Sequence, residues 1–421
     1  MDFRLPIFPL IALAFCTNAA AAPAEPPPRI EKPANSSPAQ PEKPPLNFYV
    51  AKGPDDACGA GCNEWIAAEG RFDFESYQRL RAFLNRLSGR KLPIYFSSPG
   101  GMVSQALAIG RLLRERGLTA GVASTTPQGC EPPADKEEAC LALKHSGRAV
   151  TAAWNAIDAN CNSSCVYALL GGKQRQVPPG ARLGVHSGKV LRVVRVGGDV
   201  KNVTDETSAP RTKAKAHEID VELRRYAREM GIDPGLIDEA EKIPFEQVRY
   251  LSRDEIARFG IDARPLIETR WTVVDVPSKP LAVFTFMVEA KGGNNKEFRT
   301  GILRLACSSA ATLAVAYIRG LAGDEIGHVA TIKLTASGRD LVFPRIGKVS
   351  KIDALDNGAT FDSRAVRAPL DFFDKAAAAE NIDIVVTDLA DPALAPRVRR
   401  LSTSGLGSAV EVLRRRCAAA P

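Results

Sequence analysis

Short apolar strands alternate with amphipathic helices from residue 47 to about residue 267, and this alternation constrains the fold more than any other feature. Residues 92–96 form an apolar run typical of a strand, and the apolar residues from Met102 to Leu113 then recur at helical spacing. The pattern predicts a layered α/β domain. With 421 residues, the chain is long enough for a second domain of ordinary size.

The pattern changes after about residue 267, where strand-like segments dominate up to the C-terminus. They cover residues 271–276, 281–289, 301–306, 331–334 and 382–387. We therefore predict a β-rich, sandwich-like domain over residues 268–421, separate from the α/β domain of residues 47–267.

The N-terminal residues have the pattern of a secretory signal peptide. Residues 5–16 are apolar but too few to span a bilayer, and small residues follow them. We assign residues 1–22 to the signal peptide, with cleavage between Ala21 and Ala24, and residues 23–46 to an extended, proline-rich linker. This assignment predicts a periplasmic or secreted protein with no stable membrane span after cleavage.

Removal of Cys16 with the signal peptide would leave eight of the nine cysteines, and an even number in an exported chain predicts disulfides. Proximity along the chain favours the pairs Cys58–Cys62, Cys130–Cys140 and Cys161–Cys165. The apolar face of the last helix points Cys417 into the core of the second domain, where Cys307 is its favoured partner. The alternative is a set of buried thiols.

The formal net charge of +8 comes from basic and acidic residues that are interspersed along the chain. This distribution, without a nucleic-acid-binding motif, argues against a nucleic-acid partner. The chain has four histidines and no Cys-x-x-Cys pair, so we expect no metal site. We also expect no cofactor.

A turn after the strand of residues 92–96 is the first segment suited to catalysis. It reads Ser98-Pro99-Gly100-Gly101 and leads into a helix. Paired glycines allow close backbone approach, and amides at the start of a helix can bind an oxyanion. Most turns of this composition only reverse the chain, so the motif needs support from elsewhere.

Two further segments supply the reactive side chains. Residues 161–165 read Cys-Asn-Ser-Ser-Cys and lead into an apolar helix, where Ser164 would lie beside free backbone amides. Alone, this serine is more simply a helix cap. A short strand then ends at His186, and histidine is the residue type best suited to general-base catalysis near neutral pH.

The order and spacing of these segments resemble those of the Clp protease proteolytic subunit and the crotonase-like superfamily, over roughly residues 65–261. The resemblance implies a Clp protease-like layered fold with Ser164 as the nucleophile and His186 as the general base. It also implies an oxyanion hole made by the amides of Cys165 and of Gly100 or Gly101. Ser163 becomes the nucleophile if the register shifts by one residue.

The chain departs from the family at the position of the triad aspartate, where Pro244 stands. Glu241 or Glu246 would then be the third member, or the site has none. Signal peptide peptidase A has a related fold and uses a lysine as the base, and Lys213 and Lys215 lie at about the right separation from the serine. We favour the histidine.

These observations leave two functions open. One is an exported, ATP-independent serine peptidase, a hydrolase that acts on peptides or unfolded protein segments through its Ser-His pair. The other is a catalytically inactive Clp-like module that binds a peptide or serves as a scaffold. The missing acid favours the second, and the retained serine and histidine favour the first. The resemblance also leaves a homo-oligomer open.

Overall fold

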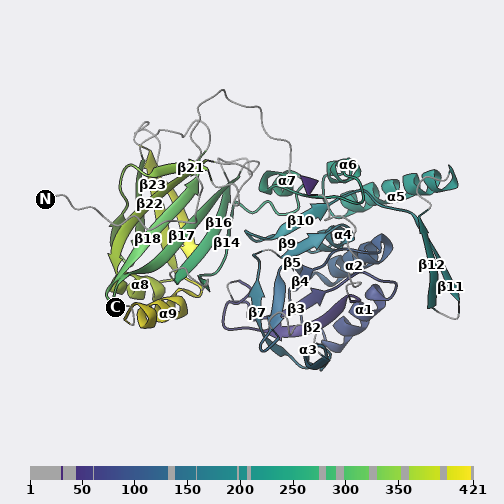
Figure 1. The fold of residues 1–421 in the computed structure, drawn as a ribbon, viewed down its shortest axis with the longest axis horizontal. Helices are drawn as coiled ribbons and strands as arrows, with labels where there is room; N and C mark the ends of the chain where they lie inside the picture. Colours follow the sequence, from purple (N-terminus) through teal and green to yellow (C-terminus); the bar gives the residue numbers. More distant parts are fainter. Residues whose placement is uncertain are drawn as a thin grey trace.

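The computed structural model describes residues 30–31, 44–59, 61–130, 138–157, 159–196, 199–205, 210–274, 281–290, 298–321, 330–351, 360–388 and 396–418. The predicted signal peptide and most of the predicted linker lie outside these residues. The chain forms an α/β lobe and a β-rich lobe that lie side by side (Figure 1). No described helix is both long enough and apolar enough to cross a membrane.

A seven-stranded sheet forms the centre of the α/β lobe, in the order β6-β7-β2-β3-β4-β5-β9. Its strands are β2 (Asn47–Lys52), β3 (Glu64–Glu69), β4 (Ile94–Ser97), β5 (Thr119–Val122), β6 (Ser124–Pro127), β7 (Val150–Asn155) and β9 (Gln174–Gln176). Strands β3, β4, β5 and β9 run parallel, so their carboxyl ends meet at one edge of the sheet.

The described part of this lobe contains the helices α1 (Ser76–Arg86), α2 (Val103–Arg116), α3 (Glu138–Lys144), α4 (Ser164–Leu170), α5 (Pro210–Glu229), α6 (Gly235–Glu241) and α7 (Arg253–Arg258). Ile66 and Phe96 face the core shared with α1 and α2, whereas Trp65 and Tyr95 face a second cluster on the other side of the sheet. This alternation follows from the two-residue period of strands.

The end of α4 packs directly on α2 through two glycines. A Cβ atom on Gly171 would lie 2.0 Å from the backbone oxygen of Gly110, so no larger residue fits there without moving α2. This contact fixes the position of α4 over the sheet.

A smaller sheet carries the predicted catalytic segments, in the order β1-β13-β10-β8. Its strands are β1 (Ile30–Glu31), β8 (Asn160–Asn162), β10 (Arg182–Val185) and β13 (Val248–Tyr250). β1 lies within the predicted linker and pairs with β13, and Leu46 at the end of that linker is fully buried. The two parts of the predicted linker that the structure describes therefore contact the α/β lobe. The hairpin of β11 (Leu191–Val196) and β12 (Asp199–Asp205) projects from the lobe beside α5 (Figure 1).

The C-terminal lobe consists of two antiparallel sheets, in the orders β14-β16-β17-β18-β22-β21, with β15 beside β16, and β20-β19-β23-β24. The strands of the first sheet are β14 (Leu266–Glu268), β15 (Thr272–Val274), β16 (Ala282–Ala290), β17 (Phe298–Ser309), β18 (Thr312–Gly320), β21 (Lys348–Lys351) and β22 (Thr360–Pro369). Those of the second are β19 (Ala330–Ala336), β20 (Arg339–Val342), β23 (Asn381–Asp388) and β24 (Arg397–Ser402). The helices α8 (Leu370–Ala377) and α9 (Leu406–Ala418) contribute to the core that both sheets share. A β-rich second half is confirmed.

The two lobes meet at α7 and at the segment that joins them. The backbone N–H of Phe298 donates to Asp254 Oδ1 at 2.8 Å, and Arg253 lies 5.0 Å from the Phe298 ring centroid. β14 already pairs with β16, so the second lobe begins near Leu266.

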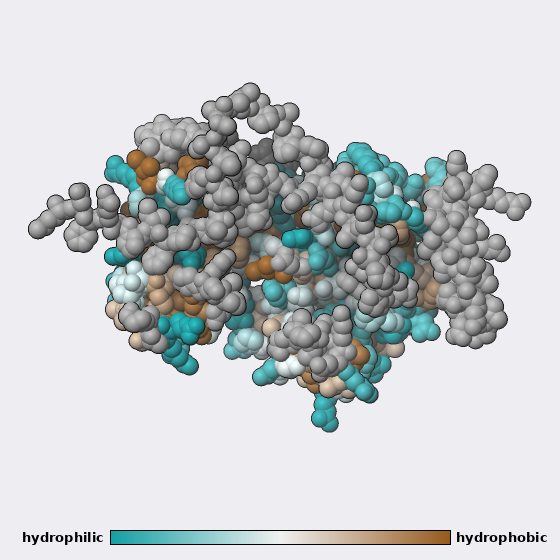
Figure 2. Space-filling model, viewed as in Figure 1, coloured by the Kyte–Doolittle hydropathy of each residue, from teal (hydrophilic) through white to brown (hydrophobic). Residues whose placement is uncertain are grey.

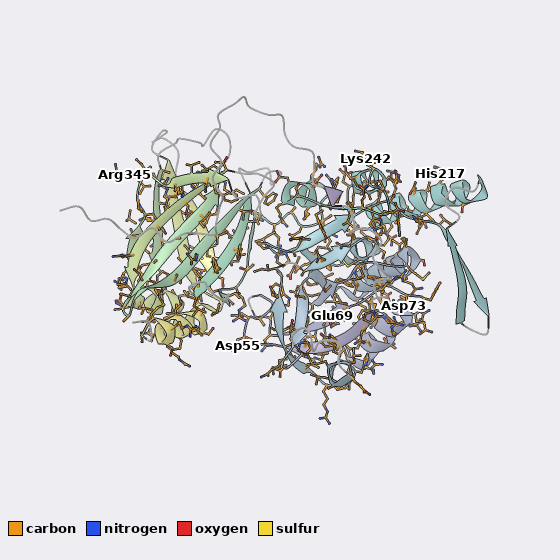
Figure 3. The ribbon with its side chains drawn as sticks, in the orientation of Figure 1. Asp55, Glu69, Asp73, His217, Lys242 and Arg345 are labelled. Atoms are coloured by element: carbon orange, nitrogen blue, oxygen red, sulfur yellow. A yellow bond between two sulfur atoms is a disulfide. The ribbon has the colours of Figure 1, made fainter. Side chains whose placement is uncertain are left out.

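Arg345 and His217 lie toward opposite ends of the molecule (Figure 3). On the face shown in Figure 2, the coloured surface is mixed, with small hydrophobic patches among hydrophilic residues.

Four disulfides link the eight cysteines that follow Cys16, in the same pairs that the sequence favours. They are Cys58–Cys62, Cys130–Cys140, Cys161–Cys165 and Cys307–Cys417. The last one ties β17 to α9 across 110 residues. Disulfides of this kind are typical of proteins outside the cytosol.

Replacing Cys307 and Cys417 together by alanine should destabilise the C-terminal lobe strongly. The chain-entropy model gives about 4.7 kcal/mol for a cross-link that closes a loop of about 100 residues. The same model gives only about 2 kcal/mol for a loop as short as that of Cys58–Cys62. Urea unfolding followed by circular dichroism should therefore show the larger loss for the Cys307–Cys417 pair, and an equal loss for both pairs would contradict this expectation.

Candidate functional site

The Ser98–Gly101 turn lies where the large sheet meets the small one. The Ser98 N–H donates to the Asn160 carbonyl at 2.8 Å, and the Asn162 N–H donates to the Ser98 carbonyl at 3.0 Å. These two bonds attach the turn after β4 to β8. The turn therefore lies beside the segment that precedes α4, as the order of the motifs predicts.

Ser163, the residue between β8 and α4, has an unusual backbone conformation. Its φ is 56° and its ψ is −126°, in a region that non-glycine residues rarely occupy. A backbone conformation of this kind raises the free energy of the folded state by about 1–3 kcal/mol. It persists where the surrounding structure holds it, often at an active site. Its N–H donates to the Gly184 carbonyl of β10 at 2.7 Å. Gly100 packs against it so closely that a Cβ on Gly100 would lie 2.7 Å from the Ser163 Cβ.

Ser164, which the family register implies as the nucleophile, begins α4 and is fully buried. Among the described residues its Oγ has no hydrogen-bond partner, so His186 does not bond to it in this structure. Ser163, in contrast, is partly exposed. The chain therefore presents the side chain of Ser163, rather than that of Ser164, at the surface beside Gly100.

His186 follows β10 directly, two residues after Gly184, which binds Ser163. Its Nδ1 lies 2.7 Å from the Ser187 carbonyl oxygen. A carbonyl only accepts, so Nδ1 carries the proton and the neutral ring keeps its lone pair on Nε2. Burial lowers the pKa of the imidazole below its ordinary value, although the Ser187 hydrogen bond and the charge of Glu246 oppose this shift. The neutral form needed by a general base is favoured.

In the described contacts of His186, the Nδ1 atom pairs with the Ser187 carbonyl, and both candidates for the third triad member pair with cations. Glu241 pairs with Arg224 at 3.0 Å, and Glu246 pairs with Lys189 at 2.6 Å. The segment that carries Pro244 does reach the histidine, but it supplies Phe245, whose ring packs edge-on at 5.0 Å between centroids. An aromatic ring and a backbone carbonyl thus hold the imidazole.

The predicted oxyanion donors are in part engaged. The Gly100 N–H donates to Ser98 Oγ at 3.1 Å, whereas the Gly101 N–H has no acceptor among the described residues. The amides of Ser164 and Cys165 occupy the first turn of α4, where a helix provides no acceptor for them. With Ser163 as the nucleophile, the amide of the next residue is that of Ser164.

The Cys161–Cys165 disulfide encloses the unusual turn. It joins the middle of β8 to the first turn of α4 and spans the three residues between them. Both cysteines are fully buried. The cross-link therefore restrains the segment that contains Ser163.

The alternative assignment of a lysine as the base stays a prediction. Lys213 and Lys215 lie in α5, but their side chains are outside the described part of the structure. Among the described residues, no group of three or more histidine, cysteine, aspartate or glutamate side chains is arranged to hold a metal ion.

Comparisons with known proteins find no matching family model and no matching curated protein. Among solved structures, the chain is similar to a variant of the membrane-bound stomatin-specific protease 1510-N, at 14% sequence identity and a TM-score of 0.29, over 47% of this chain and 75% of that chain. It is similar to a variant of ClpP1 from Listeria monocytogenes at 13% identity and a TM-score of 0.28, over 46% of this chain and 84% of that one. Likeness at this level does not assign an activity to the chain.

Proposed function

We propose that the α/β lobe is an exported, ATP-independent serine hydrolase of the peptidase type, in which Ser163 is the nucleophile and His186 the general base. The unusual backbone of Ser163, held between Gly100 and the Gly184 carbonyl, carries this proposal. Sharp turns of this kind expose a nucleophilic serine between a strand and a helix in other hydrolases. The four disulfides support export, since such bonds persist in oxidising compartments.

The proposed reaction is acyl transfer to serine followed by hydrolysis. His186 Nε2 takes the proton of Ser163 Oγ as the oxygen attacks the substrate carbonyl carbon, and the carbonyl electrons move to its oxygen. The Ser164 and Gly101 amides are the candidate donors to this oxyanion. Collapse of the tetrahedral intermediate breaks the C–N bond, and the leaving amine takes the proton from His186. Water then releases the acyl group by the same steps.

The substrate class proposed for this site is a peptide or an unfolded protein segment. The runner-up is a binding module without catalysis, which is favoured because the described partner of His186 Nδ1 is a backbone carbonyl and not a carboxylate. A triad that loses its acid loses about 10⁴-fold in turnover where the wrong tautomer results. The Ser187 carbonyl supports the correct tautomer, so we expect a slow enzyme rather than an inactive one.

Labelling with a fluorophosphonate probe tests the choice between the two functions. The native mature protein should become labelled, because the probe phosphonylates only an activated serine, and the urea-unfolded protein should not. A His186→Ala variant with an unchanged circular dichroism spectrum should lose most of the labelling. Equal labelling of native and unfolded protein would support the binding module, and full labelling of His186→Ala would show that another residue is the base.

The labelling rate should stay high at a lower pH than is usual for a histidine-dependent enzyme. Only neutral imidazole acts as the base, and burial keeps the pKa of His186 below the ordinary value of 6.5. Protonation of His186 should therefore stop the reaction only at a pH below 6.5. A rate profile from about pH 4 to 8 should show its inflection below 6.5. Phe245→Ala, which opens the imidazole ring to water, should move the inflection upward, whereas Val221→Ala, at an exposed position of α5, should not. An inflection above 6.5 in the unmodified protein would contradict the assignment.

A further inference from the structure

The hydroxyl group of Ser98 is a buried polar group beside the site for which the proposed reaction gives no role. Ser98 follows β4 directly and is only 3% exposed. Its Oγ donates to the Gly70 carbonyl at 2.6 Å and accepts from the Gly100 N–H at 3.1 Å. This one hydroxyl therefore joins the segment that follows β3 to the glycine turn, and both of its partners are backbone groups.

The Gly70 carbonyl is a fixed acceptor, because the chain around it is closely packed. Gly70 has a φ of 112°, and a Cβ atom on it would lie 2.6 Å from the backbone oxygens of Pro44 and Pro45. The next N–H, that of Arg71, donates to the Pro44 carbonyl at 2.8 Å. The hydrogen bond from Ser98 thus attaches the turn to a segment that is itself held in place.

Two backbone hydrogen bonds from the same segment fix the direction of the Gly101 N–H. The Phe72 N–H donates to the Gly100 carbonyl, and the Met102 N–H donates to the Phe72 carbonyl, each at 2.9 Å. A trans peptide unit points its C=O and its N–H in opposite directions. Since the Gly100 carbonyl points toward Phe72, the Gly101 N–H points away from it.

The proposed nucleophile lies on the side toward which this N–H points. Successive carbonyls of an extended chain point to opposite sides. The Ser97 carbonyl bonds to the segment after β3, whereas the Ser98 carbonyl accepts from the Asn162 N–H of β8 at 3.0 Å. Ser163 follows β8 directly. The Gly101 N–H therefore faces the side of the turn on which Ser163 would attack a substrate carbonyl.

We propose that Ser98 is a positioning residue, whose hydroxyl holds the glycine turn so that the Gly101 N–H donates to the oxyanion. The inference rests on the proposed function of Ser163, and Ser98 acts through the turn rather than on the substrate. Gly100 has a φ of 100°, and glycine populates both signs of φ with similar ease. Without the hydroxyl, the Gly100 N–H loses its acceptor, and the peptide units on both sides of Gly100 can rotate.

The rate of fluorophosphonate labelling of the full mature chain, measured from about pH 4 to 8, tests the proposal. At the plateau, Ser98→Ala should be labelled at least about tenfold more slowly, because a displaced donor gives up part of the 10²- to 10³-fold that one oxyanion donor contributes. The inflection should stay at the pH of the unmodified protein, because the surroundings of His186 are unchanged. In peptide hydrolysis, the same variant should lose kcat and keep its KM.

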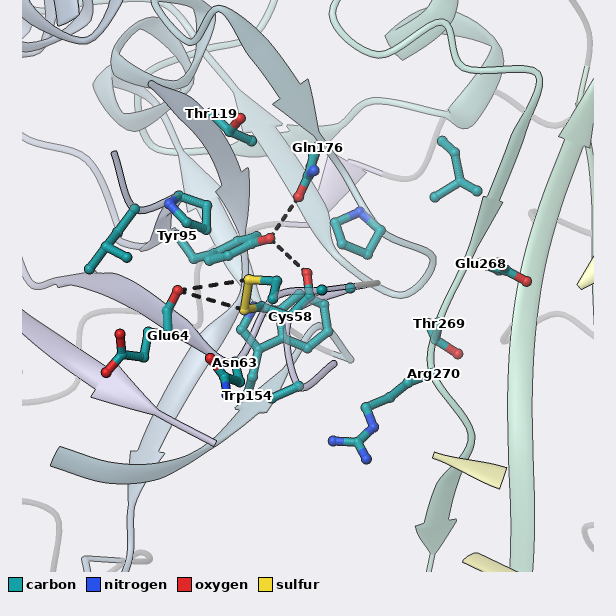
Figure 4. A pocket seen from close by; sticks show the side chains of 18 of the residues that line it. Cys58, Asn63, Glu64, Tyr95, Thr119, Trp154, Gln176, Glu268, Thr269 and Arg270 are labelled. Atoms are coloured by element: carbon teal, nitrogen blue, oxygen red, sulfur yellow. Dashed lines mark hydrogen bonds between the residues drawn. A yellow bond between two sulfur atoms is a disulfide. The ribbon is translucent and has the colours of Figure 1, made fainter. Parts of the chain in front are cut away.

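Tyr95→Phe is the matched control, because it also removes one buried hydroxyl that bonds to a backbone carbonyl, three residues before Ser98. The Tyr95 hydroxyl lies on the other side of the sheet, 3.0 Å from the Cys58 carbonyl and 2.7 Å from Gln176 Oε1 (Figure 4). Both variants should unfold at a lower temperature than the unmodified protein, and only Ser98→Ala should be labelled more slowly.

A second variant keeps the test decisive if Ser98→Ala does not fold. Ser98→Cys fills the same space with a thiol that forms only weak hydrogen bonds, so it should also slow the labelling. An unchanged rate in either folded variant, a shifted inflection, or equal slowing by Tyr95→Phe would overturn the positioning role and leave Ser163 as the nucleophile. An unlabelled native protein would overturn the proposed function, and the positioning role with it.

Discussion

The Ser163→Ala variant should lose fluorophosphonate labelling and peptide hydrolysis by at least about a thousandfold, since removing a nucleophile removes the covalent path altogether. Ser163 is the proposed nucleophile because of its backbone conformation as well as its hydroxyl group. Ser163 is the residue with φ of 56°, it is partly exposed, and it lies between Gly100 and β10. No neighbouring serine combines these properties, because Ser164 is fully buried.

Ser164→Ala is the matched control, with the same change of atoms one residue away. It removes a buried hydroxyl that has no partner among the described residues, and such a group costs about 1–3 kcal/mol when unsatisfied. We therefore expect labelling close to that of the unchanged protein, and a free energy of unfolding that stays the same or rises. Loss of labelling in Ser164→Ala with retention in Ser163→Ala would reverse the two roles.

Replacing Cys161 and Cys165 together by alanine should slow the labelling by roughly 5- to 150-fold. The disulfide spans the turn that holds Ser163. The backbone conformation of Ser163 costs about 1–3 kcal/mol, so the backbone should relax to a more stable conformation once the cross-link is absent. If the relaxed turn is more stable by about 1–3 kcal/mol, the population of the active turn falls by about 5- to 150-fold. Steady-state kinetics with a peptide substrate should show the loss in kcat, with KM little changed.

Cys58→Ala with Cys62→Ala is the control for this variant, because both disulfides join cysteines that are four residues apart. The loop closed by Cys58–Cys62 precedes the amino-terminal end of β3, whereas Ser163 lies beside the turn that follows the carboxyl end of the parallel strand β4. Its removal should leave the labelling rate nearly unchanged. Equal slowing by both pairs of substitutions would point to general destabilisation instead of a local restraint on the turn.

The alternation of strands and helices was predictable because each element carries its own periodicity. The strand at Ile94–Ser97, the helix at Val103–Arg116 and the strand that ends before His186 lie within a few residues of their predicted positions. The cysteine pairs followed from short separations and, for Cys417, from the apolar face of the last helix. These are local signals, so one sequence was enough to read them.

The choice between Ser163 and Ser164 was not predictable in the same way. Spacing along the chain defines the turn to within one residue, and the side chain that faces outward depends on the backbone angles of Ser163. Phe245 was missed because no local pattern places it beside His186, 59 residues earlier in the chain. The β1–β13 pairing also has no local signal, since β1 consists of two residues in a proline-rich segment.

The central claim is that Ser163 is the activated serine, and mapping the site of labelling tests it most directly. The native mature protein is treated with a fluorophosphonate, digested, and the modified peptide is sequenced by tandem mass spectrometry. We predict a single adduct per chain, on Ser163. An adduct on Ser164, modification spread over exposed serines, or an unmodified protein would contradict the claim.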